Sequence, residues 1–153
     1  MKRQFLWKRT AAAVFLTLAL AGQCFAAGAD PFTDIGGIAE KDKVISLQEQ
    51  GIIHGIGGGH FNPDASMTAA QGIQLLVSAF GLNIDNIRFI KEPKASDYFK
   101  NAGDSAWYSD AFIIISFSGL DLPPDLNPGA AWTREEFTYY LVTLMEKQGG
   151  LPM

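Results

Sequence analysis

Two stretches of this chain carry a series of short motifs in the same order. The first contains Gly51-Ile-Ile-His-Gly55, Phe61-Asn-Pro-Asp64 and Met67-Thr-Ala-Ala-Gln71, and the second contains Gly119-Leu-Asp-Leu-Pro123, Leu126-Asn-Pro128 and Trp132-Thr-Arg-Glu-Glu136. Asn62 corresponds to Asn127 and Thr68 to Thr133, each pair 65 residues apart. A repeat of this length predicts two copies of one supersecondary unit, neither of which can bury its apolar face alone.

The first helix of each copy is predicted from its end. We expect helices over residues 38–50 and 109–118, followed by Gly51 and Gly119. A glycine directly after a helix adopts the left-handed conformation of a C-cap at little cost. Residues 112–115 are rich in β-branched side chains and by themselves are also typical of a buried strand. The duplication favours a helix, because residues 44–47 occupy the equivalent place.

The second helix of each copy begins with a capping box. Thr68 and Gln71 have the required spacing, as have Thr133 and Glu136, so that each threonine hydroxyl and its partner side chain satisfy free amides of the first turn. Gly81 and Gly149 stand where these helices should end. One apolar face is expected on each helix, with Leu75, Leu76, Ala79 and Phe80 in the first copy and Tyr140, Leu141, Leu144 and Met145 in the second.

These elements predict an all-α fold of two tandem helix-turn-helix units. We place the first unit at residues 31–82, a connector at 83–96 and the second unit at 97–148. The connector alternates apolar and polar residues, which fits a short strand and an irregular segment about equally well.

The first 26 residues have the pattern of a signal peptide. Lys2, Arg3, Lys8 and Arg9 precede an apolar run over residues 11–21, and small residues at 24 and 26 favour cleavage after Ala26. An uncleaved signal anchor is the alternative, and a lipoprotein is less favoured because Gln23 precedes Cys24. We therefore expect a secreted protein without a membrane span after cleavage.

Cleavage would also change the charge and the cysteine content. Four of the twelve basic residues and none of the sixteen acidic residues lie in the segment, so the formal charge would pass from −4 to −8. An acidic body disfavours nucleic acid and anionic membranes as partners. Cys24 is the one cysteine of the sequence, so the mature chain would form no disulfide.

The repeated motifs resemble those of the S-layer homology family. In the first copy the resemblance lies in Phe32-Thr-Asp34, Gly51-Ile-Ile-His-Gly55, Phe61-Asn-Pro63 and Met67-Thr-Ala-Ala-Gln71. In the second it lies in Trp107-Tyr108, Gly119-Leu120, Asn127-Pro128 and Trp132-Thr-Arg-Glu-Glu136. It covers about residues 31–147, nearly all of the expected mature chain.

The resemblance implies a module that anchors non-covalently to bacterial cell-wall polysaccharide, commonly one that bears pyruvylated sugar. It implies an all-helical, pseudo-threefold bundle with glycan-binding grooves between repeats. Arg134 would grip an anionic sugar substituent through paired hydrogen bonds. Trp107 and Trp132 would offer flat faces to a sugar ring, although both also suit helix packing. Asp34 is a further candidate contact, with a local turn or cap as its alternative.

The chain departs from the family pattern at two points. Ala69 stands where the second copy has Arg134, so any anion grip is expected in the second copy. Two repeats are visible where the family usually has three, which would leave the bundle incomplete. The alternative function is therefore protein interaction, with the third face supplied by a second copy of the chain or by another envelope protein.

We find no constellation typical of an enzyme, a cofactor or a metal site. The glycine-rich residues 55–59 lack the lysine and the flanking elements of a phosphate loop. His54 and His60 lack a third ligand at fixed spacing. Glu135 and Glu136 are adjacent and so point to different faces of a helix.

Overall fold

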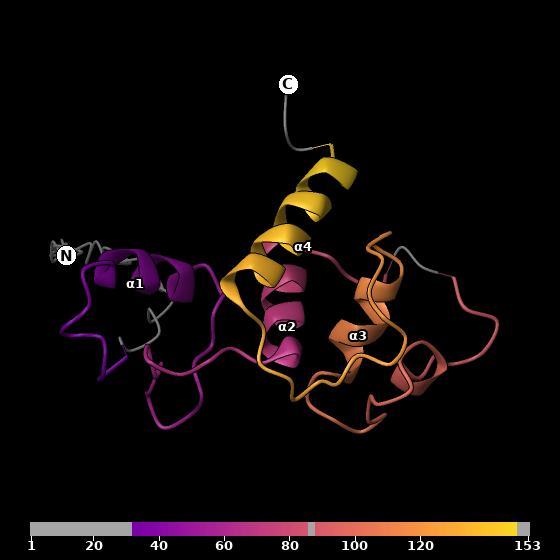
Figure 1. Cartoon of the computed structure of the whole chain (residues 1–153), viewed down its shortest axis with the longest axis horizontal. Helices are drawn as coiled ribbons and strands as arrows, with labels where there is room; N and C mark the ends of the chain where they lie inside the picture. The colour runs from indigo at the N-terminus through magenta and orange to yellow at the C-terminus, as the bar shows by residue number, and fades with distance from the viewer. Residues whose placement is uncertain (1–31, 86–87, 150–153) are drawn as a thin grey trace, which may run out of the picture.

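The computed structural model of the protein describes residues 32–85 and 88–149. Within these ranges helices joined by turns and loops form the regular secondary structure. The helices are α1 (Lys41–Glu49), α2 (Ala69–Ala79), the short 3-10 helix η1 (Ala95–Asp97), α3 (Ser109–Ser116) and α4 (Arg134–Lys147). The described residues contain no strand, only two isolated bridges, so the predicted all-α fold is confirmed. Figure 1 shows α2 and α3 in the middle, α1 at one end and α4 leading toward the C-terminus. The predicted signal peptide and Cys24 lie outside the described residues.

The ends of the helices follow the predicted local signals. Gly51, Gly81, Gly119 and Gly149 follow the four α-helices with φ of 69°, 58°, 82° and 73°, the left-handed region that glycine enters without a steric penalty. Both capping boxes are present. The Thr68 hydroxyl accepts from the Gln71 amide, and the Thr133 hydroxyl accepts from the Glu136 amide.

Two local predictions need correction, and one open alternative is resolved. Helix α1 begins at Lys41 and not at residue 38, because the residues before it form successive turns that place the amides of Ile38 and Lys41 on carbonyls three residues earlier. Helix α3 ends at Ser116 and not at residue 118. The hydroxyls of Ser116 and Ser118 accompany this end by donating to carbonyls three residues back. The described part of the connector forms no strand, and its last residues enter η1.

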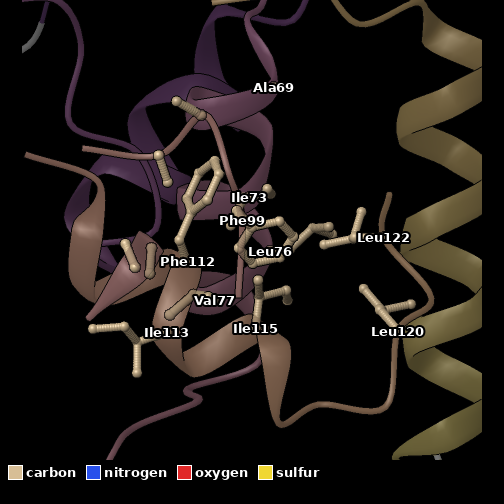
Figure 2. Close-up of a cluster of buried hydrophobic side chains, with 14 of the residues drawn as sticks. Ala69, Ile73, Leu76, Val77, Phe99, Phe112, Ile113, Ile115, Leu120 and Leu122 are labelled. Atoms are coloured by element: carbon tan, nitrogen blue, oxygen red, sulfur yellow. The ribbon is translucent and has the colours of Figure 1, made fainter. Parts of the chain in front are cut away.

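The main hydrophobic core lies between α2 and α3. Figure 2 shows Ile73 and Leu76 of α2 facing Phe112 and Ile115 of α3, and all four are fully buried. Leu144 of α4 is buried in the same cluster. The predicted apolar face of α2 is rotated in the structure: Val77 is buried, whereas Ala79, expected to be buried, is exposed.

A second, smaller cluster lies beside α1. Phe32, Ile35 and Val44 are its buried members, and Ile53 and Phe61 pack against them. The rings of Phe32 and Phe61 stack with centroids 5.4 Å apart. Residues 32–35, at the start of the first copy, therefore pack against α1 and the segments around Ile53 and Phe61, and they are not part of the main core.

Candidate functional site

The loop before α4 docks on the N-terminus of α2. The amides of Ala69 and Ala70 donate to the carbonyls of Ala130 and Pro128 at 2.8 and 3.0 Å, and the Trp132 amide donates to the Met67 carbonyl at 2.8 Å. The first amides of a helix have no partner within the helix, so a second segment must satisfy them when they are buried. This contact joins the two stretches of the sequence that carry the repeated motifs.

Trp132 completes the same contact with its ring. It is 8% exposed, it packs directly over Gly72, and it stacks on Tyr140 with ring centroids 5.0 Å apart. Of the two roles that the sequence left open, the structure places Trp132 in helix packing, and its ring has no free face for a sugar.

A groove opens beside this contact, where two hollows share Gln71 and Trp107. We call it the Trp107 groove. The larger hollow, about 700 Å³, is mostly apolar and contains Ile53, Met67 and Leu75. The smaller, about 480 Å³, is lined by Thr68, Gln71, Asn101, Trp107, Tyr108, Asn127 and the backbone around Pro128. Trp107 is 65% exposed, so an aromatic face is available to a ligand.

Each amide side chain that lines the smaller hollow uses one of its two polar atoms in a hydrogen bond to the backbone. Gln71 Oε1 accepts from the Thr68 amide at 2.8 Å, and Asn127 Oδ1 accepts from the Gly129 amide at 3.0 Å. Asn101 Nδ2 donates to the Asp125 carbonyl at 2.7 Å. Because backbone amides can only donate and carbonyls can only accept, these bonds assign which end of each side chain is nitrogen. Sequence reasoning did not propose these residues as ligand contacts, although the Asn-Pro motif marked Asn127.

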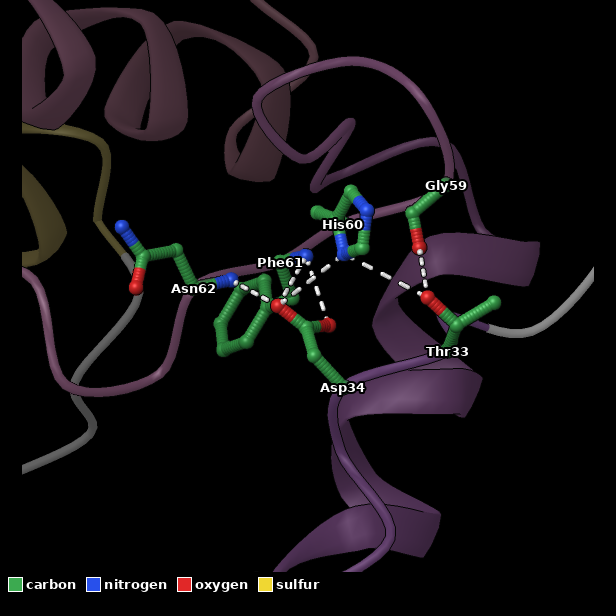
Figure 3. A network of polar contacts seen from close by, with 6 residues as sticks. All are labelled: Thr33, Asp34, Gly59, His60, Phe61 and Asn62. Atoms are coloured by element: carbon green, nitrogen blue, oxygen red, sulfur yellow. Dashed lines mark hydrogen bonds and ion pairs between the residues drawn. The ribbon is translucent and has the colours of Figure 1, made fainter.

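Asp34 is engaged with the loop that precedes α2 (Figure 3). Its carboxylate accepts from the Phe61 amide at 2.9 and 3.1 Å and from the Asn62 amide at 2.7 Å. The His60 ring nitrogen lies 3.8 Å away. The backbone hydrogen bond from Phe61, and after it that from Asn62, lowers the pKa of Asp34 below its usual value, because both favour the charged form. Asp34 lines neither hollow, and its contacts match the turn acceptor that the sequence left as the alternative.

The hydrogen bonds of Asp34 predict a dependence of stability on pH. A pKa lowered by folding makes the carboxylate stabilising above about pH 4, and this contribution is lost as the pH falls through the lowered value. We expect Asp34→Asn to lower the Tm at pH 6. At pH 2.5 the difference in Tm between the variant and the unaltered protein should be smaller. Thermal unfolding at the two pH values measures this. An equal gap at both would show that ionisation of Asp34 does not stabilise the fold.

Arg134 lies outside the Trp107 groove. It is exposed at the first turn of α4 and lines neither hollow, and the ion pairs of the described residues, His60–Asp34 and Lys91–Asp97, do not include it. The structure therefore brings Trp107 together with Thr68 and Gln71, and leaves Arg134 and Asp34 apart from them.

Within residues 32–85 and 88–149, no three His, Cys, Asp or Glu side chains gather as metal ligands would. Over the same ranges, none of the helices combines the length and the apolar character needed to cross a bilayer.

The protein is thus a helical chain with an open groove beside an exposed tryptophan. Its sequence is similar to those of cell-surface proteins. The model of the S-layer homology domain matches residues 31–71. The surface-layer 125 kDa protein of Lysinibacillus sphaericus is 28% identical over 143 residues, which are 92% of this chain and 11% of that protein. No solved structure matches.

Residues 31–71 match the S-layer homology domain, as the motifs of the first copy predicted. The family and the relative point to a module of the cell surface, and S-layer homology domains and S-layer proteins are structural, non-enzymatic families. The chain spans about a ninth of the length of the relative, so the activity of that whole protein is not transferred to it.

Proposed function

We propose that this protein attaches non-covalently to cell-wall polysaccharide at the bacterial surface and that the Trp107 groove is its glycan-binding site. The observation that carries the proposal is the exposure of Trp107 beside polar side chains. A sugar ring has an apolar face that stacks on an aromatic ring and hydroxyl groups that need donors and acceptors around its edge.

We further propose that the module consists of two S-layer homology repeats, at residues 31–82 and 97–148. Recurring hydrogen bonds support this division. Thr33 donates from its amide to the Gly59 carbonyl at 2.9 Å, and Lys100 donates to the Pro124 carbonyl at 2.8 Å. The turn that follows each Asn-Pro motif closes with a 3.0 Å bond to the asparagine carbonyl in both copies. The groove is then a site between the two repeats.

A pull-down by purified cell-wall sacculi tests the proposed function. We expect the protein to sediment with the sacculi and Trp107→Ala to weaken the affinity about tenfold, since a stacked aromatic face is lost. Arg134→Ala is the matched variant at an exposed position outside the groove. It distinguishes binding at the Trp107 groove from the binding of an anionic sugar substituent by Arg134 that the family resemblance implies. A protein that stays in the supernatant, or that binds equally well without Trp107, would contradict the proposal.

The second candidate function is self-association through α4, with a second copy of the chain as the partner. Tyr139 and Val142 lie three residues apart on this helix and are 63% and 39% exposed, and the ring of Tyr139 contacts that of its neighbour Tyr140 edge-to-face, so an apolar stripe of α4 stays open to a partner.

For this candidate we expect a dimer by light scattering that Tyr139→Ser with Val142→Ser converts to a monomer, because the substitutions remove the apolar area. A monomer at all concentrations would contradict it.

A further inference from the structure

We propose that the Trp107 groove selects an uncharged stretch of glycan, so that recognition does not depend on an anionic substituent. This inference rests on the proposed function and adds the chemical class of the ligand. It departs from the anionic sugar that the family resemblance implies.

The first argument is the charge of the groove. Among residues 32–85 and 88–149, no Lys, Arg, Asp or Glu lines either hollow. Of the described residues that line the hollows, His54 in the larger one is the only side chain that can become a cation. A carboxylate or phosphate taken from water into a protein site needs charged donors or a dense set of amides to replace its hydration. Among the described residues the groove offers no charged donor and, in its smaller hollow, only two free side-chain amides, those of Gln71 and Asn127, and Arg134 lies outside it.

The N-terminus of α2, beside the smaller hollow, does not supply the missing donors for an anion. Its leading amides could have bound an anion. Those of Ala69 and Ala70 are instead bonded to the carbonyls of Pro128 and Ala130, and that of Gln71 is bonded to the Thr68 hydroxyl. The amides at the positive end of the α2 dipole are therefore already hydrogen-bonded within the protein.

The second argument is the set of hydrogen-bonding groups that remains. Gln71 Nε2, Asn127 Nδ2 and Asn101 Oδ1 have no partner among the described residues. The Tyr108 hydroxyl accepts weakly from the Gly103 amide at 3.4 Å and keeps its own hydrogen for a ligand. Donors and an acceptor therefore stand together beside Trp107. A sugar hydroxyl both donates and accepts, so a neutral sugar satisfies this mixture, whereas an anion can only accept.

The direct test compares one polysaccharide in two charge states. The probe is cell-wall polysaccharide from L. sphaericus, used before and after carbodiimide activation and borohydride reduction of its carboxyl groups to alcohols. We expect the protein to bind both forms with affinities within about twofold of each other, and to lose less than twofold between 50 and 500 mM NaCl, since salt screens only charged contacts. Arg134→Ala, outside the groove, should leave both affinities unchanged.

A substitution inside the groove gives a second readout. Gln71→Glu keeps the capping box, because Glu136 forms the same box in the second copy, but it replaces the free Nε2 donor with a charged oxygen. We expect an unchanged Tm and about tenfold weaker binding to both forms of the polysaccharide, as for the loss of a hydrogen bond beside a newly buried charge. Glu136→Gln, the reverse change outside the groove, is the matched control and should bind normally.

The outcomes distinguish the inference from the function on which it rests. Binding to the native polymer that is lost on carboxyl reduction, or abolished by Arg134→Ala, would overturn the neutral ligand and leave the anchoring function in place. Failure of the unaltered protein to bind either form would overturn the proposed function itself.

Discussion

Replacing Trp132 with alanine is expected to lower the free energy of unfolding by about 3–5 kcal/mol, the usual cost of removing a large aromatic side chain from a core. The ring is 8% exposed, lies over Gly72 and stacks on Tyr140. Its removal leaves a cavity where the loop before α4 meets α2. Urea denaturation followed by circular dichroism measures the loss, which should appear as a lower midpoint at a similar slope.

Trp107→Ala is the matched control, since it removes the same side chain from an exposed site. Trp107 is 65% exposed, and among the residues that the structure describes its ring contacts only Tyr108, edge-to-face at 5.5 Å. We expect its removal to change the free energy of unfolding by no more than about 0.5 kcal/mol. Equal losses from the two substitutions would contradict the assignment of Trp132 to packing and Trp107 to binding.

Gly72→Ala is expected to destabilise the protein by about 1–3 kcal/mol, although the position lies inside a helix. Alanine in place of an exposed helical glycine usually stabilises by about 1 kcal/mol. Here a Cβ atom would overlap Cε3 of the Trp132 ring and lie 2.6 Å from its Cζ3. The ring is held on its other side by Tyr140, so relief of this overlap must disturb the contact between the two copies. Thermal and urea unfolding measure the change.

The double variant provides the decisive control for this prediction. With Trp132→Ala already in place, the space above residue 72 is open, and Gly72→Ala should become stabilising by up to about 1 kcal/mol. A reversal of sign gives a coupling energy of about 2 kcal/mol or more, well above what independent sites show. If Gly72→Ala stabilises the protein while Trp132 is present, the close contact is not the reason for the glycine.

The local features of the fold were predictable because each depends on a few neighbouring residues. The capping boxes at Thr68 and Thr133 formed where their spacing placed them, and glycines ended the helices. Residues 112–115 became helical as the duplication indicated, against their own strand preference. The first turn of α1 was wrong by three residues, since no capping side chain marks its beginning.

The candidate site was predicted in part. Trp107 was named in advance, and the structure places it at an open groove. Trp132 has the same side chain and was given the same possible role, but it is buried. No local pattern separates the two, because the difference depends on Gly72 and Tyr140, which lie elsewhere in the chain. Arg134 occupies the expected helical position and nevertheless lies outside the groove.

The sequence by itself determined the helices, their caps and the resemblance to the S-layer homology family, since these follow from spacing over a few residues and from motifs that are read in order. Only the tertiary structure decided which tryptophan is exposed and that the helix start at α2 is closed by Pro128 and Ala130. These properties arise where segments about 60 residues apart come into contact. Burial and hydrogen-bond partners at such a contact are set by both segments together, and neither segment encodes them alone.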